Sequence, residues 1–160
     1  MNILEAFRKF DLTFSGKFNI DREWYKNNCG VFSMNTTASS IGNDGKNSEE
    51  YYRARMVWSI VKSTLYPKEN ICVEFTIPKG SEGAKSLKPD IVIFKDSTWK
   101  SIFDSWDKTS ALPEELGKQM LVVWEVKNDH KHIENAVTKQ LSSAMNYHIG
   151  DKFLVFILMI

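Results

Sequence analysis

Three charged residues lie within two apolar segments, where charged side chains are unusual. Asp90 opens the apolar run of PDIVIF, and Glu125 and Lys127 lie in LVVWEVK. A carboxylate is costly to bury unless it is paired or binds a cation. Because side chains of a strand alternate between two faces, Glu125 and Lys127 should point the same way, roughly 7 Å apart along the strand. If the two segments form neighbouring strands in a suitable register, Asp90 and Glu125 come together.

Two neighbouring carboxylates repel each other unless a cation lies between them. Carboxylate oxygens are ligands that suit Mg²⁺, so the two segments indicate a Mg²⁺ site. The ammonium group of Lys127 beside the metal could position a water or hydroxide and balance the charge of a phosphate. Residues 128–132, NDHKH, could add phosphate contacts. The histidines of this segment also suggest a transition-metal site, but solvated loop residues are the commoner case.

A further carboxylate could come from a helix that precedes these strands. Ser48 is a good N-cap, Glu49 and Glu50 would lie in the first turn, and Pro67 would end a helix over about residues 49–65. The helical phase puts Glu50 near the middle of the apolar stripe. Glu49 lies about 100° away, nearer the edge of the stripe.

Each of these features has a simpler interpretation when it stands alone. Asp90 follows Pro89 and could be an ordinary turn residue. A Glu-x-Lys sequence occurs by chance in most proteins of this size, and acids are common in the first turn of a helix. The order of the residues, their strand context and the flanking helices make the combination more specific than its parts.

The remaining pattern predicts a single α/β domain. Strands are expected over residues 71–77, 88–95, 120–128 and 152–160, with helices over residues 1–10, 49–65 and 132–147. Residues 33–47 read as an exposed loop, and the aromatic insertion 96–117 as partly helical, with core packing favoured over a protein contact surface. Three sequential strands suggest a meander, and the helix before the last strand permits a parallel crossover. The expected architecture is a mixed sheet with a helix on each face.

Composition limits the classes of protein to consider. The chain has 160 residues and a net charge of +1, which argues against a highly basic nucleic-acid binder but leaves room for a local basic patch. Its two cysteines are too few for a disulfide scaffold, and the longest apolar run is too short to cross a membrane. We therefore expect a cytoplasmic protein without membrane contact. The last predicted strand runs to Ile160, so we expect the sequence to be part of a longer polypeptide.

The set Pro89-Asp90 and Glu125-Val126-Lys127, in this order of elements, resembles the PD-(D/E)xK nuclease superfamily. A closer likeness runs from Ser48 to the end of the chain through EEYYRARMVWSIV, YPKENICVEFTIPKG, KPDIVIF, MLVVWEVKN and KQLSSAMNY. These segments resemble the N-terminal nuclease domain of type I restriction enzyme R subunits. Residues 48–160 would then form a nuclease domain with a restriction-endonuclease-like core, and residues 1–47 an extension of helix and loop.

The resemblance implies roles for individual residues. Asp90 and Glu125 would bind Mg²⁺, which Mn²⁺ could replace, with the Val126 carbonyl as a further ligand. Lys127 would be the catalytic lysine, and either Glu49 or Glu50 the glutamate of the first helix. Gln140 matches a glutamine expected to position the site or the DNA. The family's tyrosine four residues later is Ala144 here, which leaves the role of Tyr147 in question.

The function that the resemblance implies is Mg²⁺-dependent hydrolysis of DNA phosphodiester bonds within a restriction system. DNA would be the substrate, and C-terminal translocase or methyltransferase domains and other restriction subunits the partners. The alternatives are a nuclease-fold module that binds DNA or protein without turnover, and another enzyme of the superfamily such as a transposon-end nuclease or a junction resolvase.

Overall fold

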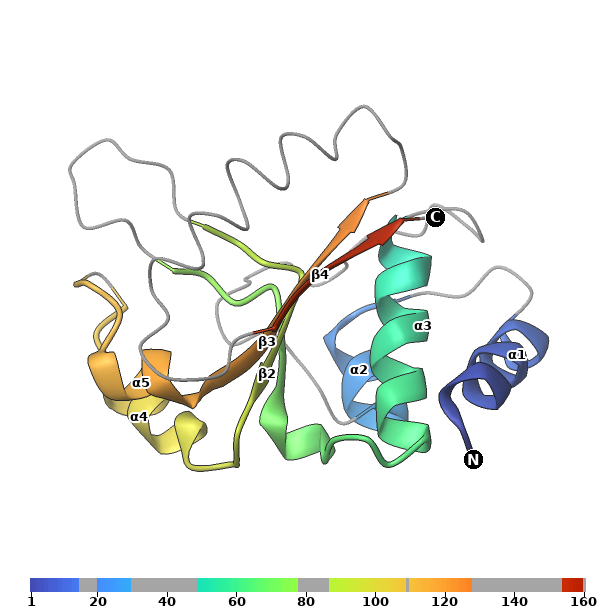
Figure 1. Cartoon of the computed structure of the whole chain (residues 1–160), viewed down its shortest axis with the longest axis horizontal. Helices are drawn as coiled ribbons and strands as arrows, with labels where there is room; N and C mark the ends of the chain where they lie inside the picture. The colour runs from blue at the N-terminus through green and yellow to red at the C-terminus, as the bar shows by residue number, and fades with distance from the viewer. Residues whose placement is uncertain (15–19, 30–48, 78–86, 109, 128–153, 160) are drawn as a thin grey trace.

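The computed structural model describes residues 1–14, 20–29, 49–77, 87–108, 110–127 and 154–159, with Lys127 and residues 154–159 described by their backbone. One sheet runs through the molecule, with helices on both sides of it (Figure 1). This arrangement confirms the predicted mixed α/β class. None of the helices in the described ranges is long and apolar enough to span a membrane.

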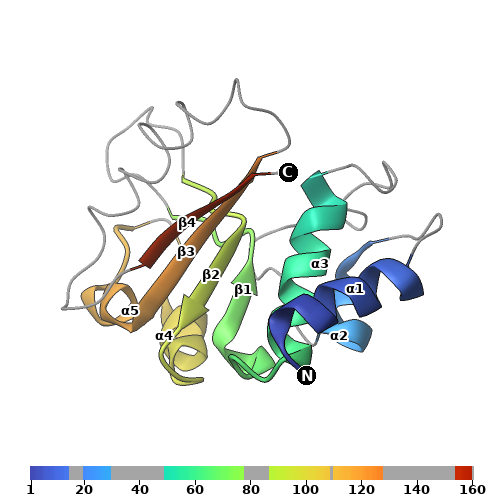
Figure 2. The same ribbon diagram turned by 45° about the vertical axis from the view of Figure 1, so that its right-hand side comes forward.

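The sheet has four strands in the order β1-β2-β3-β4, as Figure 2 shows. β1 (Ile71–Val73), β2 (Ile91–Phe94) and β3 (Met120–Lys127) pair antiparallel and form the predicted meander. β4 (Leu154–Met159) pairs with β3 in parallel. Four of the predicted strands are therefore present, although β1 and β2 are shorter than the apolar segments that predicted them.

Alternation along the strands divides the interior into two cores. One face of the sheet joins a first core through Ile71, Val73, Ile91, Ile93 and Val122. The opposite face joins a second core through Cys72, Val92, Phe94, Met120 and Val123. Because both faces are covered, the strands read as nearly continuous apolar runs.

Three helices build the first core. α3 (Glu49–Lys62) is the helix predicted over residues 49–65, and it packs against the sheet through residues that include Val57 and Ile60. α1 (Ile3–Thr13) and α2 (Arg22–Asn28) bury Phe10 and Tyr25 in the same core. α2 is a single short helix that the sequence pattern did not predict. Its first turn is capped by Asp21, whose side chain accepts a hydrogen bond from the Trp24 amide at 2.7 Å.

The insertion between β2 and β3 builds the second core. It contains α4 (Trp99–Ser105) and α5 (Glu114–Gln119). The ring of Trp99 stacks on Phe94 of β2 with centroids 4.3 Å apart, and its Nε1 donates to the Glu69 carbonyl of a 3₁₀ turn, Lys68–Asn70. The aromatic residues of the insertion therefore pack in the core, as expected. The predicted helix 132–147 and loop 33–47 lie outside the described residues, as do residues 78–86.

Candidate functional site

Register places three acidic residues in a row across the meander. Val73 pairs with Ile91, and Ile91 pairs with Trp124. One position further along the strands, Glu74, Asp90 and Glu125 lie opposite one another. The Glu74 amide donates to the Asp90 carbonyl at 2.8 Å, which continues the β1–β2 pairing to this level. The predicted proximity of Asp90 and Glu125 depends on neighbouring strands in this register, and both conditions are present.

The side chain of Asp90 accepts a hydrogen bond from β3 at the point where the backbone pairing between β2 and β3 ends. By the same register Val126 would lie opposite Pro89, but β2 begins only at Ile91. The Val126 amide instead donates to Oδ2 of Asp90 at 2.7 Å. The other carboxylate oxygen, Oδ1, accepts from Nη1 of Arg53 at 2.9 Å. Both oxygens of Asp90 are thus held, one by the sheet and one by α3.

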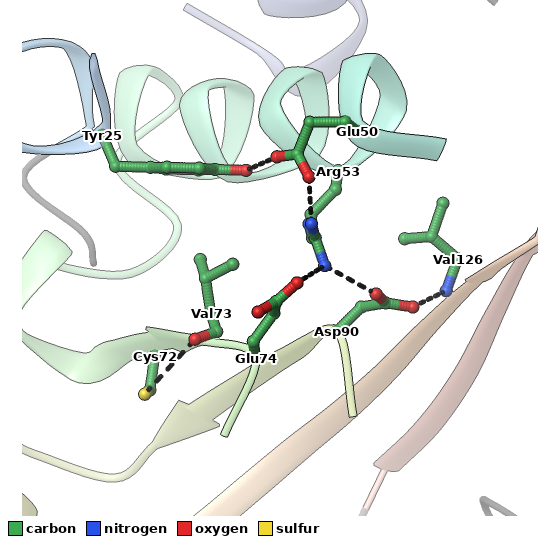
Figure 3. Close-up of polar contacts among 8 residues, drawn as sticks. All are labelled: Tyr25, Glu50, Arg53, Cys72, Val73, Glu74, Asp90 and Val126. Carbon is green, nitrogen blue, oxygen red and sulfur yellow. Dashed lines mark hydrogen bonds and ion pairs between the residues drawn. The ribbon is translucent and has the colours of Figure 1, made fainter. Parts of the chain in front are cut away.

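Arg53 connects the row of acids to α3. Its Nη1 also forms an ion pair with Oε1 of Glu74 at 2.9 Å, and its Nη2 donates to Oε2 of Glu50 one turn earlier on the helix. Figure 3 shows the guanidinium between Glu50 on one side and Glu74 and Asp90 on the other. The side chain of Arg53 is 9% exposed, so the guanidinium is a buried positive charge at the end of the strands.

Glu50 is the first-turn glutamate that faces this cluster. It is 5% exposed, and its second oxygen, Oε1, accepts from the hydroxyl of Tyr25 at 2.8 Å (Figure 3). Glu49 is exposed. The structure therefore places Glu50, and not Glu49, beside the residues that contact Asp90, which agrees with the phase of the helix.

Burial and charge act against each other in this cluster. Burial raises the pKa of Glu50 above its ordinary value, although the charge of Arg53 and the hydrogen bonds from Arg53 and Tyr25 lower it. Burial alone would lower the pKa of Arg53, but the neighbouring Tyr25, Glu50 and Asp90 outweigh it and hold the pKa well above its usual range. Arg53 is therefore a cation at neutral pH.

The other predicted site residues are placed to different degrees. Glu125 is 2% exposed within β3, and Val126 follows it with its amide on Asp90. Lys127 is the last residue of β3, two positions after Glu125. Gln140 and the segment 128–132 lie outside the described residues.

The donors at this end of the sheet fit a hard divalent cation by their chemistry. Carboxylate and peptide oxygens suit Mg²⁺, which proteins commonly bind with one or two carboxylates and complete with water and phosphate. Across the described ranges, no three or more His, Cys, Asp or Glu side chains gather as a ready metal cage. The guanidinium of Arg53 is a positive charge that meets Asp90, Glu74 and Glu50 together.

Three members of the cluster were not among the predicted site residues. Glu74 had a signal in the sequence, because ICVEFTI places an acid inside an apolar run just as PDIVIF and WEVK do. Arg53 lies on the same helical face as Glu50, three residues later, where side chains meet. Tyr25 had no signal, because its segment has no pattern that connects it to α3.

One comparison with known proteins gives a match. The family described as the type I restriction enzyme R protein N terminus matches residues 48–156. This range holds α3, the strands β1 to β3, the first part of β4 and the acidic residues of the cluster. No curated protein and no solved structure matches the chain.

Proposed function

Because the chain belongs to the family of type I restriction enzyme R protein N-terminal domains, we propose that it is a Mg²⁺-dependent DNA endonuclease domain of a restriction protein. The observation that carries the proposal is the row of Glu74, Asp90 and Glu125 across three neighbouring strands. Acids are rarely gathered at the end of a buried sheet unless they serve a site.

The proposed fold is the restriction-endonuclease-like core of the PD-(D/E)xK superfamily. The proposal is supported by the order of α3, the antiparallel meander β1–β3 and the parallel strand β4. The helix expected between β3 and β4 lies outside the described residues. Pro89-Asp90 lies directly before β2, and Glu125-Val126-Lys127 closes β3. In such an arrangement the two parts of the motif meet at one end of the sheet.

We assign the metal to Asp90 and Glu125, with the carbonyl of Val126 as a further ligand. Bound there, Mg²⁺ would act as a Lewis acid that stabilises the negative charge developing on the scissile phosphate. Two contacts within the chain hold the Asp90 carboxylate in position for this role. The Val126 amide orients the Asp90 carboxylate, and Arg53 forms an ion pair with Asp90 while it also contacts Glu50 and Glu74.

Lys127 has the role of orienting the attacking water and assisting its deprotonation. Strand alternation gives position 127 the phase of Glu125. Glu50 holds Arg53 against Asp90 from the first turn of α3. Gln140 is assigned to positioning of the site or the DNA on the strength of the family pattern alone. The DNA backbone is the proposed substrate, and other domains or subunits of the restriction complex would choose the target.

The test is nicking of a supercoiled plasmid with Mg²⁺ or Mn²⁺. Lys127→Ala should slow cleavage by about 100-fold or more, the range typical of losing a catalytic proton-transfer group. Asp90→Ala should also slow cleavage strongly, because it removes a proposed ligand of the metal. The matched controls are Asp104→Ala and Lys100→Ala, which remove an exposed ion pair on α4 and should cleave like the wild type. Equal cleavage by Asp90→Ala, Lys127→Ala and their controls would refute the site.

A metal-binding measurement tests the site without cleavage. Calorimetry should detect Mn²⁺ binding to the wild type and to Asp104→Ala, and Asp90→Ala should abolish it. A wild type that neither nicks DNA nor binds Mn²⁺ would overturn the proposal.

A second candidate function is favoured by one observation. Both oxygens of Asp90 are engaged by Arg53 and Val126, as in a nuclease fold that binds DNA or protein without turnover. Such a module would bind DNA while failing both the nicking and the Mn²⁺ experiment.

A further inference from the structure

The N-terminal helices reach the candidate site through one hydrogen bond. The hydroxyl of Tyr25 on α2 donates to Oε1 of Glu50 at 2.8 Å, while Arg53 holds the other oxygen of the same carboxylate. Tyr25 lies outside residues 48–156, the range that matches the family. Glu50 is therefore oriented by two donors, one of which the family range does not contain.

The position of Tyr25 is fixed by the first core. The residue is 1% exposed, and its ring meets Trp24 edge-on with centroids 5.3 Å apart. Asp21 caps the start of α2, and Cys29 at its end is buried in the same core. Because the ring is packed on all sides, its hydroxyl group is held in one position, beside Glu50.

A continuous line of polar contacts runs from this hydroxyl to the strand ends. Tyr25 donates to Glu50, Arg53 donates to Glu50 and to Asp90, and Asp90 accepts from the amide of Val126 (Figure 3). Two residues thus separate Tyr25 from Asp90. A change in the orientation of Glu50 would be passed to Arg53, because the same guanidinium contacts both carboxylates.

The phenol is a donor throughout the useful pH range. Burial and the charge of Glu50 raise the pKa of Tyr25 well above its ordinary value. The hydroxyl consequently keeps its proton, and the Glu50 carboxylate always meets a donor at Oε1.

We propose that Tyr25 is a positioning residue for the candidate active site, which makes α2 a working part of that site. Tyr25 acts through Glu50 and Arg53 to hold the carboxylate of Asp90 in place. This inference rests on the proposed nuclease function. It adds Tyr25 and α2 to the proposed site, and both lie outside the residues that match the family.

The competing explanation is that Tyr25 only satisfies a buried polar atom. Tyr51 supplies a matched control for this explanation. It is also 1% exposed, and its hydroxyl also donates to a carboxylate, Asp11 of α1, at 2.8 Å. Tyr51 thus joins the N-terminal helices to α3 by the same chemistry, but its carboxylate partner is Asp11 rather than Glu50.

The experiment compares Tyr25→Phe with Tyr51→Phe in the whole chain. Both should lower the thermal midpoint, Tyr51→Phe by less, because the hydroxyl of Tyr25 bonds a buried carboxylate and that of Tyr51 a partly exposed one. Tyr25→Phe should reduce the nicking rate at saturating DNA and the Mn²⁺ affinity by about tenfold, as outer partners of metal ligands do. Tyr51→Phe should stay within about twofold of the wild type in both. Equal effects of the two substitutions on rate and Mn²⁺ affinity would overturn the inference.

Two further experiments test whether Tyr25 acts through Glu50 and α2. In a Glu50→Gln background, Tyr25→Phe should cause no additional loss of rate, since both changes act through one carboxylate; fully additive losses would overturn the inference. If Tyr25→Phe does not fold, Asp21→Ala replaces it. This substitution removes the cap of α2 and is matched by Asn2→Ala, which removes the cap of α1.

Asp21→Ala should lower Mn²⁺ affinity relative to Asn2→Ala, and indistinguishable affinities would refute the role of α2. The result for the wild type separates the two proposals. If the wild type neither cleaves DNA nor binds Mn²⁺, both the nuclease function and the inference are refuted. If the wild type is active and Tyr25→Phe has the same rate and Mn²⁺ affinity, only the inference is refuted.

Discussion

Replacing Arg53 with Met is the most direct test of the charge cluster. Met keeps a long flexible apolar stem but removes the guanidinium. Three carboxylates then lose their shared counter-ion, those of Glu50, Glu74 and Asp90. The side chains of Glu50 and Asp90 are 5% and 15% exposed, so water cannot replace the lost charge well.

The expected loss of stability is large for a single substitution. Removing one partner of a buried ion pair costs about 3–5 kcal/mol, because the other charge stays buried without compensation. For a chain of this size each kcal/mol shifts the thermal midpoint by roughly 3 °C, so a loss of about 4 kcal/mol corresponds to roughly 12 °C.

Arg55→Met is the matched control on the same helix. Arg55 pairs with Asp11 at 2.7 Å, but the two side chains are 27% and 32% exposed, and its guanidinium also lies over the ring of Phe7. A half-exposed pair and one such ring contact together contribute about 1 kcal/mol, or roughly 3 °C. Thermal unfolding at neutral pH compares the two variants directly. Equal midpoints for Arg53→Met and Arg55→Met would refute the claim that Arg53 neutralises a buried acidic cluster.

Two further predictions concern stability. The folded state raises the pKa of Glu50 above the unfolded value near 4.5, so it binds that proton more tightly than the unfolded state does. The contribution of Glu50 is therefore complete below pH 4.5 and is lost as pH rises through the folded pKa. In urea titrations the stability of the wild type minus that of Glu50→Gln should fall with rising pH, and a constant difference would contradict this. Thr64→Gly should stabilise the chain by about 1 kcal/mol, because Thr64 has a φ of 58°, a conformation that favours glycine. Thr64 lies at the end of α3, where its amide donates to the Val61 carbonyl and the Leu65 amide donates to the Ile60 carbonyl. Thr64→Ala, which keeps a Cβ at this position, should show no comparable gain.

The strands and α3 were predictable because their signals are local. Apolar runs bounded by turn residues mark β1 to β4, and the first-turn acids and Pro67 mark α3. The ends of β1 and β2 were not predictable, because they depend on pairing. β1 stops at Val73 and the next residue, Glu74, takes a positive φ of 54°. A side chain in that conformation leaves the regular pleat, which no propensity reveals.

Some residues of the candidate site could also be predicted from local sequence, and others could not. Asp90 and Glu125 were found because an acid in an apolar strand is anomalous on its own. Arg53 was not assigned to the site, because an arginine on an amphipathic helix looks like an ordinary surface residue. Tyr25 required the packing of α2 against α3, which joins segments 25 residues apart in the sequence. Contacts of this kind follow from the shared core and not from any local pattern.

The concentration of buried acids gives the strongest physical reason to regard this cluster as a site. Arg53 meets three carboxylates, those of Glu50, Glu74 and Asp90, and these groups are mostly buried. The register adds Glu125, 2% exposed, opposite Asp90. Apolar residues of similar volume at these positions would often give equal or greater stability, so packing alone does not account for the acids. Carboxylate and peptide oxygens are the donors that hold Mg²⁺, so a bound divalent cation would give the acids a function. Such a site predicts that divalent cations should stabilise the wild type against heat, and that Asp90→Asn, which removes one negative charge, should reduce this effect.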